Sequence, residues 1–303
     1  MRAGPAPRSA LVFHPGGALG DFVLVWPLLR TLRAQGADVE LISASSRVSL
    51  ARRVLGVRGS DAERPEWTLL WRGPSVEGHP PRHEIDLVVG VGVNAAWIGA
   101  ARQRFTMAEI VVPPGLLDRE EALALQRRAG PQVAVPRFQE AVRPLEVVCH
   151  VGSGGGKKSW ELGRWLATGK ALADRGVRVR LVAGEVEREL WTTECLQSFE
   201  KGGGRLLGSL DELVDAIAPA AVFVGADTGP SHLAAQLGVP TLALFGPTNP
   251  GVWSPLGPSV WVLAPAVPCP MDWLESGAVA DAVESLLGTG RLPLHSHERL
   301  SRQ

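Results

Sequence analysis

The chain has 303 residues, 45% of them hydrophobic, and its 31 basic residues balance its 31 acidic ones. This length suits two α/β domains better than one core, and a formal net charge of zero provides no global field to attract a nucleic acid, so no such partner is expected. Three widely separated cysteines fit a reducing cytosol, and no run approaches the roughly 18 apolar residues of a membrane span. We expect a cytoplasmic protein, with any membrane contact peripheral.

Apolar runs suited to buried strands alternate with segments of helical periodicity along most of the chain. In the first part, strands are expected at 10–13, 39–43, 67–71, 86–92 and 110–112, and helices at 21–34, 47–55, 94–101 and 116–129. In the second part, strands are expected at 146–151, 177–183, 205–207, 221–224, 241–245 and 259–263, and helices at 161–174, 187–199, 210–217, 230–237 and 273–287. This alternation predicts an α/β fold with parallel sheets.

A stretch with three prolines and no periodicity, residues 130–144, is the expected linker. It predicts a first Rossmann-like domain at 1–135 and a second at 145–272, with a polar tail at 289–303. Ligands are expected between the two domains, at the carboxyl ends of the strands. His79 and His83 lie in a proline-rich loop and are expected to face solvent.

A polar turn, Asp227-Thr228-Gly229, separates the predicted strand 221–224 from the helix that follows Pro230. Unpaired N–H groups and the positive end of the helix dipole make such a helix start a site for phosphate, and His232 lies in the first turn. The alternative is that Asp227 and Thr228 only cap the helix.

A glycine-rich turn follows the first strand of the second domain and ends in Lys157 and Lys158. It is not a nucleotide-triphosphate loop, because Val151 and Lys158 stand where that motif needs glycine and Ser or Thr. A flexible turn rich in N–H groups, including that of Ser153, and in ammonium groups suits a diphosphate. Glu185, at another strand end, could accept hydrogen bonds from a ribose or simply cap a helix, and the absence of Asp-x-Asp gives no support for a bound metal.

Three segments resemble glycosyltransferase family 9, the ADP-heptose:lipopolysaccharide heptosyltransferases. DTGPSHLAAQLGVPTLALFGPTNP resembles the donor-site segment of the family, and GALGDFVLVWPLLRTLR resembles its N-terminal signature. Lys158-Ser159-Trp160 resembles its phosphate-contacting lysine segment, although Glu161 replaces the usual proline. The resemblance implies a GT-B fold, in which two Rossmann-like domains face an interdomain cleft and helix 273–288 crosses back to the N-terminal domain.

The resemblance also implies a reaction. Asp21 would be the catalytic base, although an aspartate there commonly caps a helix, and Gly17 and Gly20 would form a loop near acceptor and donor. The donor-binding residues would be Ser153, Lys158, Glu185, Asp227, Thr228, Gly229 and His232. The expected reaction is inverting, metal-independent and free of cofactors: a sugar, by resemblance the heptose of ADP-heptose, moves from a nucleotide-sugar co-substrate to a saccharide or glycolipid acceptor such as lipopolysaccharide core, on the cytoplasmic side of the inner membrane. The alternatives are a GT-B nucleotide-sugar epimerase and a non-catalytic nucleotide-sugar binding protein.

Overall fold

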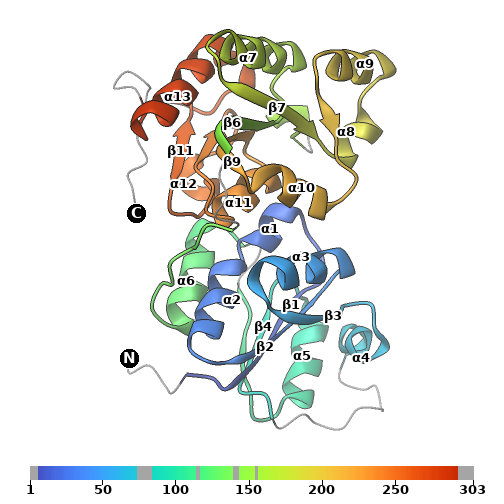
Figure 1. The fold of residues 1–303 in the computed structure, drawn as a ribbon. Helices are drawn as coiled ribbons and strands as arrows, with labels where there is room; N and C mark the ends of the chain where they lie inside the picture. Colours follow the sequence, from blue (N-terminus) through green and yellow to red (C-terminus); the bar gives the residue numbers. More distant parts are fainter. Residues whose placement is uncertain (1–5, 74–83, 114–116, 139–142, 154–155, 293–303) are drawn as a thin grey trace. The chain divides into compact units, whose positions relative to one another are not determined.

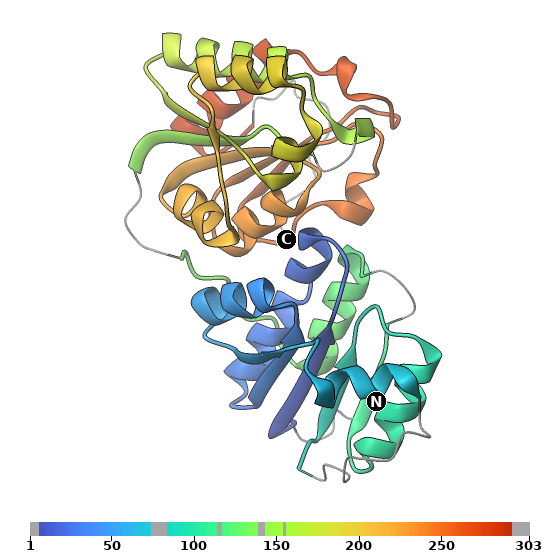
Figure 2. The same cartoon turned by 90° about the vertical axis from the view of Figure 1, so that its right-hand side faces the viewer.

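The computed structural model describes residues 6–73, 84–113, 117–138, 143–153 and 156–292 (Figures 1 and 2). The chain divides into two compact units, Met1–Ala134 and Val135–Gln303, and the division falls inside the predicted linker. Each unit is a parallel sheet with helices on its faces, which confirms the predicted α/β fold class. His79, His83 and most of the predicted tail lie outside the described residues.

The first unit has a sheet of five parallel strands in the order β3-β2-β1-β4-β5. The strands are β1 (Ser9–His14), β2 (Asp38–Ser43), β3 (Arg58–Asp61), β4 (Leu87–Gly90) and β5 (Glu109–Val111). The helices are α1 (Leu19–Val23), α2 (Trp26–Ala34), α3 (Ser45–Leu55), α4 (Pro65–Thr68), the 3-10 helix η1 (Leu69–Arg72), α5 (Ala95–Arg104) and α6 (Arg119–Ala129). β1 lies in the middle of the sheet, where it pairs with β2 on one edge and β4 on the other. The loop that follows β1 therefore starts from a strand that is hydrogen-bonded along both edges.

The predicted strand 67–71 is wrong, because this segment is helical. Pro65 opens α4 with a fixed φ, and Trp67 and Leu70, three residues apart, both point into the core. In that core, Trp67 and Trp97 meet Phe13 edge to face at centroid distances of 5.4 and 4.9 Å. The unpredicted strand β3 is a polar edge strand, so it carries no apolar pattern.

The predicted helix 21–34 is in fact two helices, α1 and α2. Pro27 stands in the first turn of α2 and has no N–H to continue the hydrogen bonds of α1. The break leaves α1 as a short helix that carries Asp21.

The second unit has a sheet of six parallel strands in the order β11-β10-β9-β6-β7-β8. The strands are β6 (Arg143–His150), β7 (Arg178–Ala183), β8 (Arg205–Leu206), β9 (Ala220–Ala226), β10 (Thr241–Leu244) and β11 (Val260–Leu263). The helices are η2 (Gly156–Lys158), α7 (Leu162–Asp174), α8 (Glu185–Leu190), α9 (Thr193–Lys201), α10 (Leu210–Ile217), α11 (Gly229–Gln236), α12 (Pro250–Trp253), η3 (Met271–Trp273) and α13 (Ser276–Thr289).

One large core cluster joins the sheet of this unit to α7 and α13, which lie side by side (Figure 1). Trp160 and Trp165 meet edge to face at 4.9 Å inside it. The contacts described for α13 lie within the second unit, on α7 and β9, and its predicted crossing to the first unit stays a prediction. The predicted helix 187–199 is two helices, because the Thr192 hydroxyl accepts a hydrogen bond from the Cys195 N–H and starts α9.

No helix in the described part of the chain has both the length and the apolar character to cross a bilayer.

Candidate functional site

Three polar side chains meet at the carboxyl ends of three neighbouring strands in the second unit. Lys158 follows β6, Asp227 follows β9 and Thr248 follows β10, and β9 lies between the other two strands. The Lys158 ammonium lies 2.7 Å from Asp227 Oδ2, and the Thr248 hydroxyl donates to the same oxygen at 2.8 Å. Asp227 is 5% exposed, whereas the Lys158 side chain is 37% exposed. The cluster therefore presents an ammonium group whose carboxylate partner is buried beneath it.

The N-terminus of α11 begins next to this cluster, two residues after Asp227. Thr228 is its N-cap, but the Thr228 side chain accepts no capping hydrogen bond. The helix is instead tied to its strand by Ser231, whose hydroxyl donates to the Ala226 carbonyl at 2.6 Å. His232 is buried in the first turns, and Gly229 opens the helix. The positive end of an eight-residue helix thus lies beside a lysine, a combination that favours anions.

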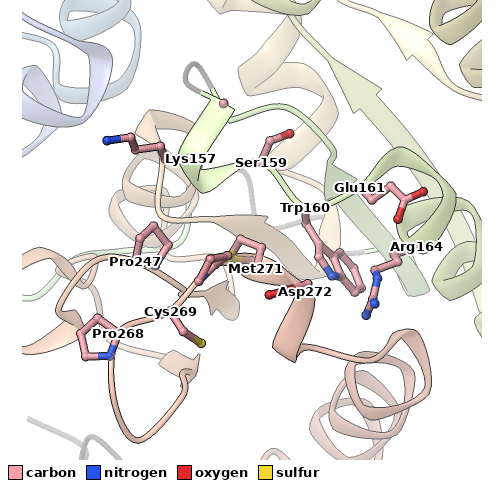
Figure 3. A pocket seen from close by; sticks show the side chains of 12 residues that line it. Lys157, Ser159, Trp160, Glu161, Arg164, Pro247, Pro268, Cys269, Met271 and Asp272 are labelled. Carbon is pink, nitrogen blue, oxygen red and sulfur yellow. The ribbon is translucent and has the colours of Figure 1, made fainter.

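A cavity of about 640 Å³ adjoins the turn that carries Lys158. Lys157 and Pro247 lie on one side of it and Glu161 and Arg164 on the other (Figure 3). Between them lie Trp160, Met271 and Asp272, and the remaining lining includes Ser159, Pro268 and Cys269. The mixture of an apolar floor with two cations and two carboxylates suits a neutral, polyhydroxylated ligand.

The end of β7 carries a buried carboxylate that the sequence did not single out. Glu185 is exposed at the start of α8, whereas Glu187 is 5% exposed and accepts a hydrogen bond from the Gly184 N–H at 2.9 Å. A Cβ on Gly152 would overlap the Glu187 carboxyl group. The His150 ring lies 3.3 Å through Nδ1 from the Gly152 carbonyl, and burial lowers the pKa of this histidine although the Glu187 charge opposes that effect. Gly152 is therefore required by packing.

The first unit holds the glycine loop that was predicted to carry the base. Asp21 is half-buried in α1, and its Oδ2 accepts a hydrogen bond from the Ala18 N–H at 3.0 Å. Gly17 has φ +86°, and a Cβ there would lie 3.0 Å from the same Asp21 oxygen. Gly20 lies in the first turn of α1, and its carbonyl accepts a hydrogen bond from the Leu24 N–H. The carboxylate therefore does cap its helix, as in the alternative reading, while it lies against the loop.

His14 and Arg47 lie beside this loop, and Arg47 donates hydrogen bonds to it. His14 ends β1 at 2% exposure, and burial, together with the nearby Arg47 charge, lowers its pKa to about 4. Arg47, on α3, donates to the Gly16 carbonyl at 2.7 Å and also to the Gly17 carbonyl. Its guanidinium lies 3.4 Å from His14 Nδ1 and 5.7 Å from the centre of the Phe22 ring.

The structure thus brings Lys158, Asp227, Thr228 and the start of α11 together, as the sequence predicted, and places Ser153 half-buried just beyond β6. Glu185 lies outside this group. Thr248 was missed, although its place in a polar turn after the neighbouring strand was a usable signal. Arg47 gave no signal, since α3 carries three arginines that look alike in the sequence.

Known proteins resemble this chain in sequence and in fold. The model of glycosyltransferase family 9 (heptosyltransferase) matches residues 110–272, more than half of the chain. Lipopolysaccharide heptosyltransferase 1 of Pseudomonas aeruginosa is 36% identical over 112 residues, which cover 37% of this chain and 32% of the relative. The matched segment thus spans about a third of that relative.

Two solved structures share the fold over most of the chain. E. coli ADP-heptose lps heptosyltransferase II has a TM-score of 0.70 at 20% identity, covering 92% of this chain and 98% of its own. The E. coli heptosyltransferase WaaC with ADP has a TM-score of 0.65 at 18% identity, covering 91% and 99%. Both are heptosyltransferases, and at these identities the likeness shows the fold. The chain belongs to glycosyltransferase family 9, the heptosyltransferase family.

Proposed function

We propose that this protein is an inverting, metal-independent glycosyltransferase that moves a heptose from ADP-heptose to a saccharide acceptor such as lipopolysaccharide core. The observation that supports this most directly is the cluster of Lys158, Asp227 and Thr248 beside the start of α11. The E. coli heptosyltransferase WaaC has been solved with ADP and with ADP-2-deoxy-2-fluoro heptose, and both compounds contain the diphosphate that such a cluster would bind.

The donor diphosphate would bind to Lys158 and to the N–H groups at the start of α11, including that of Gly229. The ammonium and the helix dipole would stabilise the negative charge that grows on the leaving group, and they would do so without a metal. His232, in the first turns of the helix, and Ser153, beyond β6, would add polar contacts. Asp227 and Thr228 would orient the sugar and the phosphate.

The remaining parts of the donor would extend to either side of the diphosphate. Glu185, at the start of α8, would accept hydrogen bonds from the ribose. The cavity lined by Lys157, Glu161 and Asp272 suits the sugar ring, because its apolar floor and balanced charges match a neutral polyol better than a phosphate or an acyl chain.

Asp21 would act as the general base. It would take the proton of the acceptor hydroxyl while that oxygen forms a bond to the anomeric carbon and the bond from this carbon to the diphosphate breaks. The products are the glycoside and ADP, with the proton on Asp21. A single displacement of this kind inverts the anomeric centre. Gly17 places no side chain against the Asp21 carboxylate, and Gly20 adds none to the first turn of α1. The acceptor would be met at the cytoplasmic face of the inner membrane.

The Asp21→Asn variant tests this assignment. Asn caps a helix about as well as Asp, so the variant should keep its thermal stability and its affinity for ADP, whereas transfer should fall by roughly 10²–10⁴-fold because the base is gone. Heptose transfer from ADP-heptose to heptose-deficient lipopolysaccharide, ADP calorimetry and thermal unfolding are measured on the same sample.

Asp118→Asn is the matched control. Asp118 caps α6 in the same unit by accepting from the Glu121 N–H at 2.8 Å, so its replacement should change none of the three quantities. Full transfer by Asp21→Asn would remove Asp21 from catalysis. Binding of ADP-heptose by the wild-type protein, without transfer, would favour a binding protein instead.

A further inference from the structure

We infer that Arg47 is a positioning residue for the catalytic loop. Its side chain fixes the backbone of Gly16 and Gly17 and so holds the Asp21 carboxylate in place. This inference rests on the proposed role of Asp21 as the base. Arg47 lies 26 residues further along the chain, on α3, and no sequence motif marks it.

Arg47 donates hydrogen bonds to the loop, and it also lies near enough to Asp21 for that charge to oppose the lowering of the guanidinium pKa by burial. Its guanidinium donates to the Gly16 carbonyl at 2.7 Å and to the Gly17 carbonyl, one carbonyl for each terminal nitrogen. A planar fork can hold two successive carbonyls at once, whereas a single ammonium cannot match that geometry. Glycine residues give the loop more backbone freedom than any other residues would, so the loop needs an external restraint. Arg47 supplies it.

The guanidinium has two further contacts, and one of them involves the nitrogen that donates to the Gly16 carbonyl. It lies 5.7 Å above the centre of the Phe22 ring and 3.4 Å from His14 Nδ1. Because burial keeps His14 neutral, with a pKa of about 4, Nδ1 can accept the hydrogen bond from Arg47. The His14 carbonyl in turn accepts a hydrogen bond of 2.6 Å from the buried Ser43 hydroxyl at the end of β2. Arg47 therefore contacts a residue fixed in the sheet, His14, while it donates hydrogen bonds to the loop.

The backbone of Gly17 and Ala18 connects the Arg47 hydrogen bonds to the Asp21 carboxylate. Gly17 lies directly against Asp21 Oδ2, and the next residue, Ala18, donates its N–H to that oxygen. A shift of Gly16 and Gly17 would therefore move the donor that orients the carboxylate. A displacement of about 1 Å in a catalytic group lowers a rate by as much as roughly 100-fold, so a small loosening should be visible in turnover.

The test compares Arg47→Met and Arg47→Lys with Arg52→Met, an exposed arginine on the same helix. Arg47→Met should lower kcat by about 10- to 100-fold and leave both the KM for ADP-heptose and the ADP affinity within about twofold of wild type, because the donor-binding residues lie in the other unit. Arg47→Lys should recover part of kcat, since it keeps the charge but loses the fork. Arg52→Met should match wild type. If Arg47→Met raises KM instead, or leaves kcat unchanged, the inference is wrong.

Hydrogen exchange, which does not depend on activity, distinguishes local loosening of the loop from unfolding of the unit. Hydrogen exchange in Arg47→Met should accelerate in the peptide that spans residues 14–22 and remain slow in β1 and in the rest of α3. Acceleration throughout α3 would indicate a purely structural role and would overturn the inference.

A double-mutant cycle with Asp21→Asn separates this inference from the proposed function. If Arg47 acts through Asp21, adding Arg47→Met to Asp21→Asn should lower the remaining rate no further. Additive losses would contradict the inference while leaving Asp21 as the base. A fully active Asp21→Asn variant would contradict the role of Asp21 as the base, whatever Arg47→Met does, whereas a wild-type protein that binds ADP-heptose without transfer would contradict the proposed function itself.

Discussion

A single buried carboxylate, Asp227, organises the candidate donor site. It accepts from both Lys158 and Thr248 through one oxygen, so the three residues act as a unit rather than as separate ligands. Two of them could be found in the sequence, because each follows a predicted strand and stands in a motif of recognisable chemistry. The third, Thr248, was missed: its polar turn after the neighbouring strand was a signal, but the contact that gives it importance, with a residue 21 positions away, is visible only in the structure.

Lys158→Ala should weaken ADP binding by about 1.5–3 kcal/mol, the scale of a hydrogen bond to a charged group. Calorimetry in EDTA measures this without any contribution from divalent metal. The loss should also lower thermal stability, because Asp227 is left buried without its cation.

Two further variants separate these effects. Lys157→Ala, in the same turn, should leave ADP affinity nearly unchanged, since Lys157 is exposed and lines the neighbouring cavity. Adding Asp227→Asn to Lys158→Ala should restore stability but not ADP affinity. Undiminished ADP binding by Lys158→Ala would exclude Lys158 from the site.

His14 makes the stability of the first unit depend on pH. Its folded pKa of about 4 lies below the ordinary value of 6.5, so the unfolded chain binds a proton more readily. The stabilisation is complete above pH 6.5 and is lost as the pH falls from 6.5 to 4, by at most about 3 kcal/mol. Unfolding of the first unit, followed by urea denaturation at pH 7 and pH 4.5, should show this loss. His14→Asn should remove the part due to His14, and an identical pH dependence in both proteins would refute the assignment.

At the scale of elements, the strands and helices with clear periodicity were predicted well, including α10 and the strand–turn–helix around Asp227. The errors have local causes. The strand expected at 67–71 is helical because the spacing of Trp67 and Leu70 fits a helix, and β3 is polar because only one of its edges is paired. Two long helices are each divided, by Pro27 and by the cap at Thr192.

The turn after β6 provides a test of packing between elements. Gly152→Ala should lower the free energy of unfolding by about 1–3 kcal/mol, because the new methyl group would overlap the buried Glu187 carboxylate. Gly156→Ala, in the same turn, meets no atom within 4 Å and should be neutral. Thermal unfolding of the two variants makes the comparison. Adding Glu187→Asp, which is one methylene shorter, should recover part of the stability lost by Gly152→Ala, and equal stability of the two glycine variants would argue against this packing.

At the scale of the whole molecule, all the proposed donor-binding residues belong to the second unit, whereas Asp21 and its loop belong to the first. ADP should therefore slow hydrogen exchange around residues 150–158 and 225–236 and raise the unfolding temperature of the second unit, by mass action on its folded state. A mass-spectrometric exchange experiment on the full chain, with and without ADP, measures this. Protection at the strand ends of the first sheet, with none in the second, would contradict the assignment of the donor residues.

The ion pair between Lys158 and Asp227 has a consequence for the enzyme's cycle. The Lys158 ammonium is engaged by a buried carboxylate, so a diphosphate that binds to Lys158 would have to share or displace that partner. If the diphosphate binds to Lys158 as proposed, the same carboxylate would lie beside it after transfer and would repel it. Asp227 would therefore weaken donor binding. It would also speed the release of ADP, so product release becomes a step that Asp227 assists.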